Sequence, residues 1–151
     1  MKIIRYFIEF ISILSLFCTF KIIGLKKASD LGGILGSHIG PFFRSKNIIK
    51  KNIKIGLGAI DESHERSIMN GMWSNIGRNL AEYVFLKEFK EDNKNLNYVK
   101  INGLQYLEEI KRDAEPVIFF SGHFGNIELI KMQLRKLDIK FAALHRPVNN
   151  I

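Results

Sequence analysis

The chain has 151 residues, a formal net charge of +8, 46% hydrophobic residues and a single cysteine. This length suffices for one hydrophobic core, so one domain is the default expectation. The single cysteine excludes an intramolecular disulfide. The sequence also has no Gly-rich phosphate loop, no metal-ligand cluster and no nucleophilic Ser or Cys motif, and these absences disfavour the corresponding enzyme classes.

The positive charge is concentrated in the first part of the chain. Residues 1–60 carry ten Lys and Arg against two acids, whereas residues 61–151 carry thirteen of each. Such a segment attracts anionic lipid headgroups, at about 1 kcal/mol for each close charge, and an acidic protein is a second candidate partner. Nucleic acid is not expected, because neither an aromatic-basic platform nor a known binding motif is present.

The N-terminal segment reads as membrane-associated. Residues 10–20 are uncharged and largely apolar, but a helix of that length covers only about half of the hydrocarbon thickness. A span over residues 3–25 is long enough and would have to accommodate Glu9 and Lys21. We predict that residues 1–27 form an uncleaved anchor or an interfacial helix. A buried core helix is the alternative. Basic residues flank both ends, so the charges do not fix an orientation.

The middle of the chain is expected to be mostly helical. The glycine-rich stretch at residues 31–43 is either a second membrane-touching element or a site of close helix packing. A helix is predicted from Asp61 to about residue 86. Its expected apolar stripe is Trp73, Ile76, Leu80 and Tyr83 or Val84. Its expected polar face is Asn75, Arg78, Asn79 and Glu82. Arg78 and Glu82 either form an ordinary exposed ion pair, or they line a catalytic cleft or brace the catalytic loop.

The C-terminal part predicts an α/β unit. Short strands are expected at residues 98–101, 117–120 and 141–144, with helices at residues 104–112 and from about 127. A helix between two strands favours a right-handed parallel crossover. His123 lies in the turn after the second strand and Glu128 in the first turn of the following helix. In open α/β sheets, ligands bind where strands end in this way.

The pair of His123 and Glu128 is also suited to a specific reaction. A histidine with a pKa near neutrality can take a proton from an alcohol as the oxygen attacks an acyl carbon. A hydrogen-bonded carboxylate fixes the imidazole tautomer that this requires. Negative charge is also favoured at the start of a helix. Alternatively, His123 is an ordinary turn residue and Glu128 a solvated acid.

Three stretches resemble one family. FFSGHFGNIEL at residues 119–129 contains His-x4-Glu and resembles the catalytic box of the bacterial lipid A biosynthesis acyltransferases. MWSNIGRNLAEY at residues 72–83 resembles that family's upstream helix motif. HRPVNN at residues 145–150 is similar to its Tyr-Arg-Pro-x-Asn-Asn segment, with His145 replacing the usual Tyr. Order and spacing agree, and the likeness covers the whole chain.

The resemblance implies transfer of a fatty acyl chain from acyl carrier protein to a hydroxyl of a lipid A precursor. His123 would be the general base and Glu128 its orienting partner. Arg146, Asn126, Arg78 and Glu82 would bind substrate, with Arg146 suited to a phosphate or carboxylate. The alternative for Arg146 is an ordinary surface arginine stiffened by Pro147. No metal or organic cofactor is implied. The expected location is the bacterial inner membrane, with the active site on the cytoplasmic side and anionic lipids as partners.

Family members are about twice as long as this chain. We therefore expect residues 28–151 to be the N-terminal part of a glycerolipid-acyltransferase-like α/β domain that is truncated, with the full-length protein as the enzyme. Two alternative functions remain open. One is the same chemistry on another glycolipid or phospholipid acceptor, and the other is a non-catalytic basic module at the membrane surface.

Overall fold

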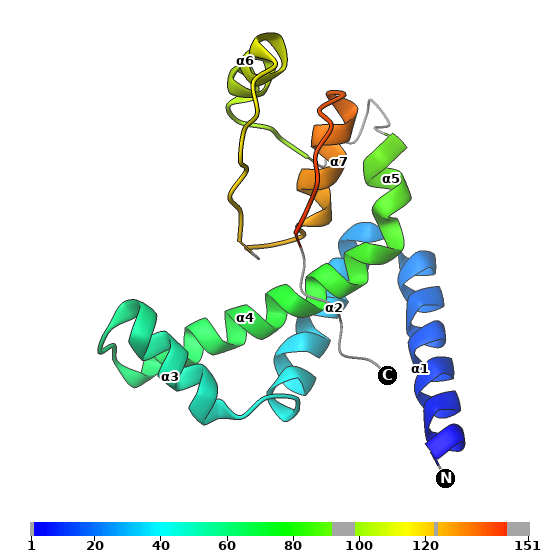
Figure 1. Ribbon diagram of the computed structural model, residues 1–151. Helices are drawn as coiled ribbons and strands as arrows, with labels where there is room; N and C mark the ends of the chain where they lie inside the picture. Colours follow the sequence, from blue (N-terminus) through cyan, green and yellow to red (C-terminus); the bar gives the residue numbers. More distant parts are fainter. Residues whose placement is uncertain (1, 92–98, 123, 145–151) are drawn as a thin grey trace. The chain divides into compact units, whose positions relative to one another are not determined.

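The computed structural model describes residues 2–91, 99–122 and 124–144 (Figure 1). The chain divides into two compact units, Met1–Glu88 and Phe89–Ile151. The first contains α1 Lys2–Ile23, α2 Leu25–Ile39, the 3-10 turn η1 Gly40–Phe42, α3 Lys46–Leu57, α4 Glu62–Glu82 and the 3-10 turn η2 Tyr83–Phe85. Helix α5 Leu86–Glu91 crosses the boundary, and the second unit contains α6 Leu104–Asp113 and α7 Glu128–Lys136. Residues 1–27 lie within the first unit, and the predicted domain boundary after residue 27 stays a prediction.

The predicted α/β class is wrong for this structure, since none of the described residues forms a β-strand. The described residues at 99–101, 117–120 and 141–144, expected as strands, lie outside any helix or strand. Ile118 and Phe120 are 81% and 91% exposed. A strand requires a neighbour that completes its hydrogen-bonded ladder, and the described part of the chain supplies none. The predicted parallel crossover is wrong for the same reason.

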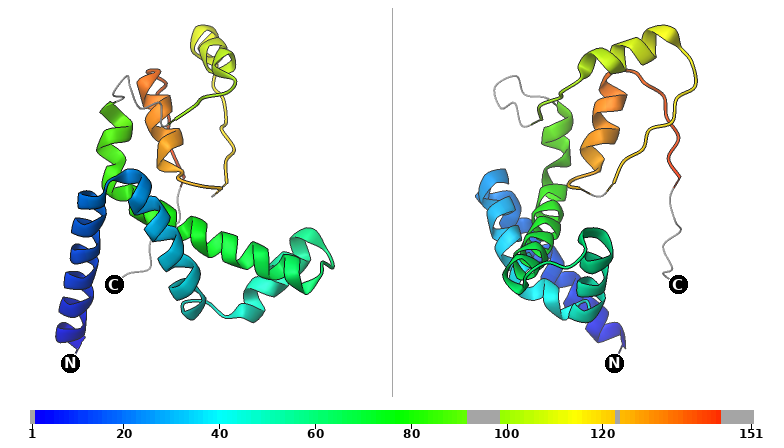
Figure 2. Two further views of the ribbon diagram at one scale, coloured as in Figure 1. Left: turned by 180° about the vertical axis from the view of Figure 1, so that it is seen from behind. Right: turned by 90° about the vertical axis from the view of Figure 1, so that its left-hand side faces the viewer.

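Helices α2 and α4 lie against each other (Figures 1 and 2), and glycines bring their backbones to close range. A Cβ placed on Gly32 would lie 2.5 Å from the carbonyl oxygen of Gly77 and 2.8 Å from the Cβ of Ala81. A Cβ on Gly36 would collide with the carbonyl oxygen of Trp73 and lie 2.9 Å from the Cα of Gly77. The glycines of this stretch therefore serve close helix packing, one of its two predicted roles, and its contact with a membrane stays a prediction.

The buried stripe of α4 differs from the predicted one. It consists of residues four apart, namely Met69, Trp73, Gly77 and Ala81. Only Trp73 was expected there, while Ile76, Leu80 and Tyr83 are 40%, 56% and 42% exposed. The buried face of α4 is the one along which the backbone of α2 approaches most closely. Small residues allow that approach, so they are buried there in place of larger apolar residues.

Helix α3 adds a small core against α4. Ile49, Met69 and Trp73 are buried together, and Ile53 and Met72 pack against them. The start of α4 was predicted correctly at Asp61. Its carboxylate accepts hydrogen bonds from the Ser63 hydroxyl at 2.6 Å and the His64 N–H at 2.9 Å. These hydrogen bonds lower the pKa of Asp61, and the bond from Ser63 has the largest effect.

Among its described residues, helix α1 is held at its C-terminal end. Phe20 is 2% exposed, and Lys21 forms an ion pair with Glu88 and lies 5.1 Å from the centre of the Phe85 ring. By contrast, the described residues 4–19 are exposed apart from a half-buried Leu16. The alternative of a buried core helix is therefore not supported.

The exposed part of α1 is apolar. Ile4–Ile23 has a mean hydropathy of 1.8 and is long and apolar enough to cross a membrane, by length and composition. Glu9, the acid that such a span would have to accommodate, is paired with Arg5 at 2.8 Å. Pairing reduces the cost of bringing that carboxylate into a membrane.

The second unit contains the segment of the predicted catalytic box. Its buried apolar residues among those described are Phe89, Leu134 and Ile139. The N–H of Ile139 donates to the carbonyl of Leu134 at 3.0 Å. This bond folds the chain back after α7. The helices predicted at 104–112 and from about 127 are confirmed as α6 and α7.

Candidate active site

The proposed general base, His123, lies outside the described residues. Its neighbours in the chain form a tight bend, in which the N–H of Phe124 donates to the carbonyl of Gly122 at 2.9 Å. Phe124 is 93% exposed, and helix α7 begins four residues later at Glu128. The predicted turn followed by a helix is thus confirmed, although the histidine's contacts are not described.

Glu128 is the first residue of α7, where the helix dipole favours a negative charge. Its carboxylate forms an ion pair with the ammonium of Lys131, and the two side chains are 29% and 39% exposed. This pair holds the carboxylate in place at the helix start. An orienting partner for a catalytic histidine has to be held in place in this way.

Asn126 shapes the start of the same helix. Its side-chain oxygen accepts a hydrogen bond from the Glu128 N–H at 3.3 Å, and its carbonyl accepts from the Leu129 N–H at 3.1 Å. Backbone donors at a helix start otherwise lack partners, so this residue fixes where α7 begins. Asn126 therefore positions Glu128, and substrate binding by Asn126 stays a prediction.

Lys131 is a residue that the sequence reasoning missed. Its position three residues after Glu128 on the same helix was the available signal, because side chains at i and i+3 are neighbours. The ion pair places the ammonium of Lys131 beside the carboxylate of Glu128, the predicted orienting partner of His123.

Arg78 and Glu82 belong to a polar cluster between α2 and α4 in the first unit. The Arg78 guanidinium donates to Asp30 at 2.7 Å and to the Ser29 hydroxyl at 3.3 Å, and that hydroxyl donates to Glu82 at 3.0 Å. Ser29 and Asp30 lie almost fifty residues away in the sequence, so no local pattern pointed to them. The structure brings Arg78 and Glu82 together through Ser29, and their role in binding substrate stays a prediction.

Arg146 lies outside the described residues, as does the rest of the HRPVNN segment. Within the described ranges, no group of three or more His, Cys, Asp or Glu residues is placed to hold a metal ion.

A family model described as bacterial lipid A biosynthesis acyltransferase matches residues 1–151. The chain belongs to this family. No curated protein and no solved structure matches the chain. Family membership assigns the chain to the lipid acyltransferases and to lipid A biosynthesis, in agreement with the resemblance carried by its three motifs.

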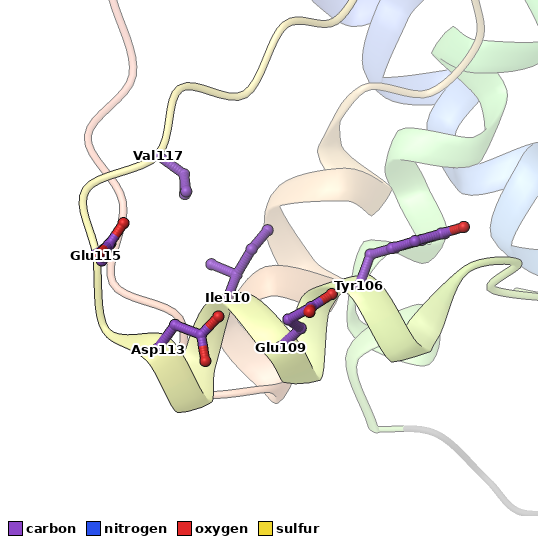
Figure 3. A pocket seen from close by; sticks show the side chains of 6 residues that line it. All are labelled: Tyr106, Glu109, Ile110, Asp113, Glu115 and Val117. Atoms are coloured by element: carbon purple, nitrogen blue, oxygen red, sulfur yellow. The ribbon is translucent and has the colours of Figure 1, made fainter.

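An open hollow of about 290 Å³ lies beside α6 in the second unit of this acyltransferase (Figure 3). It is lined by Tyr106, Glu109, Ile110, Asp113, Glu115 and Val117. None of the predicted site residues that the structure describes lines it. Its carboxylates would repel a phosphorylated lipid or an acidic carrier protein. We therefore do not assign the hollow to substrate.

Proposed function

We propose that this acyltransferase moves a fatty acyl chain from acyl carrier protein to a hydroxyl of a lipid A precursor. The observation that carries the proposal is the family match over residues 1–151, which includes all three motifs. The paired, helix-starting position of Glu128 supports the carboxylate's part in it.

In the proposed reaction, the acceptor hydroxyl oxygen attacks the thioester carbonyl carbon of the carrier-bound acyl chain. His123 takes the hydroxyl proton as the new C–O bond forms. The C–S bond then breaks, and the proton passes from His123 to the departing thiolate. Glu128 orients His123 and stabilises its positive charge, as a carboxylate does beside a catalytic histidine.

The remaining expected residues have binding roles in this proposal. Arg146 and Arg78 bear guanidinium groups suited to phosphate, and Asn126 and Glu82 would contribute hydrogen bonds to the acceptor. The exposed apolar part of α1 would hold the enzyme at the bacterial inner membrane, with catalysis on the cytoplasmic side. No cofactor is required beyond the thioester-bearing arm of the carrier protein.

The test is a transfer assay in membranes containing the 151-residue chain or a longer form. Labelled acyl groups are offered on acyl carrier protein or on coenzyme A, with a lipid A precursor, a glycosylated phospholipid or glycerol phosphate as acceptor. Transfer from the carrier protein to the lipid A precursor is expected. Preference for another acceptor would replace the substrate assignment, and transfer to none by either form, with both folded, would favour the non-catalytic membrane module.

A further inference from the structure

The turn after α2 and the outer side of α3 form a mixed apolar and basic surface. Phe42 and Phe43 are 89% and 79% exposed, and Arg44 follows them directly. Large aromatic side chains this exposed are costly in water unless something covers them. We call this the Phe42–Ile55 surface. Its residues are Phe42, Phe43, Arg44, Ile48, Lys51, Lys54 and Ile55.

The direction of α3 is fixed by its packing. Ile49 is 7% exposed and Ile53 is half-buried, both against the core that α3 shares with α4. Ile48, Lys51 and Ile55 follow one another at intervals of three and four and therefore share the opposite side of the helix. Ile48 and Ile55 are 43% and 74% exposed there, so the first unit leaves this second apolar side of α3 partly uncovered.

The charge of this region has one sign. Residues 31–60 contain five basic residues and no acid. Lys50 is neutralised by Glu65 at 2.8 Å, and this interaction raises the pKa of Lys50. Arg44, Lys51 and Lys54 are exposed and have no ion-pair partner among the described residues.

Exposed phenylalanines bordered by long basic side chains match one kind of partner, a bilayer with anionic lipids. The aromatic rings can enter the boundary between headgroups and acyl chains, while Lys and Arg reach the phosphates. Within the first unit, α1 and α2 run in opposite directions, so the Phe42–Phe43 turn lies toward the end where α1 begins (Figures 1 and 2). The turn and the exposed apolar helix α1 can therefore contact one membrane.

We propose that the Phe42–Ile55 surface is a second membrane contact, in addition to α1. Phe42 and Phe43 insert at the lipid interface, and Arg44, Lys51 and Lys54 bind anionic phosphates. This contact would make the insertion of the turn depend on anionic lipid even when α1 already holds the chain to the bilayer. An acidic carrier protein is the competing occupant.

The test places a reporter in the turn. In Phe43→Trp, the added tryptophan is followed in vesicles of phosphatidylcholine, with or without phosphatidylglycerol, using brominated lipids as quenchers. The buried Trp73 contributes a background that the unsubstituted chain supplies. The surface variant combines Arg44→Gln, Lys51→Gln and Lys54→Gln with this reporter. A matched control carries Lys90→Gln, Lys100→Gln and Lys140→Gln, exposed lysines outside the surface that give the same net charge.

We expect the brominated lipids to quench the fluorescence of the reporter tryptophan of Phe43→Trp in anionic vesicles. This quenching should be lost in the surface variant and retained in the control variant. About fivefold weaker insertion for each removed charge is expected at low salt. An unquenched reporter in vesicle-bound chain would overturn the proposal, as would equal losses in the surface and control variants. A reporter that responds to acyl carrier protein and not to lipid would assign the surface to the carrier. Turnover is not measured, so failure here leaves the acyl transfer proposal intact.

Discussion

Replacing Gly77 by alanine should destabilise the first unit, although alanine is the better helix former. The added Cβ would collide with the carbonyl oxygen of Gly32 and lie 2.9 Å from both the carbonyl carbon of Gly32 and the Cα of Gly36. All three atoms belong to the backbone, so no side-chain rotation relieves the overlap. Helices α2 and α4 would have to move apart and lose part of their contact.

Gly71 in the same helix provides a matched control. A Cβ at Gly71 meets nothing within 4 Å, so Gly71→Ala should stabilise the chain by about 0.5–1 kcal/mol through helix propensity. That gain is common to both variants, so the difference between them isolates the overpacking cost. Overpacking of a dense interior costs about 1–3 kcal/mol, and a backbone collision places Gly77→Ala in the upper part of that range.

The assay is denaturant unfolding in detergent, followed by the fluorescence of Trp73. This residue is the only tryptophan in the chain and is 8% exposed at the same interface. A lower midpoint for Gly77→Ala than for Gly71→Ala, with unchanged slopes, would confirm the glycine packing. Equal midpoints would show that α2 and α4 do not approach as closely as described.

Three further predictions concern charged groups. Glu128→Gln keeps the helix start but removes the charge proposed to orient His123, so the initial rate of acyl transfer should fall by up to about 10²–10⁴-fold. Lys131→Gln should lower that rate less, and equal rates for the unsubstituted enzyme and both variants would refute the orienting role of Glu128. Arg78→Gln breaks a half-exposed ion pair with Asp30 and should lower the free energy of unfolding by about 1 kcal/mol or less. A much larger loss of kcat/KM would identify Arg78 as a substrate-binding residue, whereas an unchanged kcat/KM would identify it as a structural one. The pKa of Asp61 is lowered in the folded state, so the ionised carboxylate stabilises the fold at pH values above its unfolded-state pKa near 4, and this stabilisation is lost as the pH falls through the folded-state pKa. Asp61→Asn should therefore flatten the decline of the unfolding midpoint at acid pH. An unchanged dependence of the midpoint on pH would count against the helix cap.

The local features of the fold were predictable where they depend on neighbouring residues. Asp61 starts α4 with hydrogen bonds to Ser63 and His64, a pattern visible in the sequence itself. The bend before Glu128 and the helix that begins there follow from local turn and helix signals in the same way.

Features that depend on distant residues could not be predicted. An apolar run at residues 117–120 indicates a strand only if a neighbouring strand exists, and periodicity says nothing of that neighbour. The buried stripe of α4 was misassigned because hydrophobic patterns weigh side-chain size, whereas Gly77 is buried by the close approach of α2. Likewise, Ser29 and Asp30 became partners of Arg78 only through that packing.

The most direct measurement of the central claim compares acyl transfer by the unsubstituted enzyme and by His123→Ala. The assay uses acyl carrier protein as donor and a lipid A precursor as acceptor. His64→Ala is the control, because this exposed histidine of α4 lies outside the three motifs. We expect a loss of about 10²–10⁴-fold for His123→Ala and little change for His64→Ala. Full activity in His123→Ala would contradict its assignment as the general base.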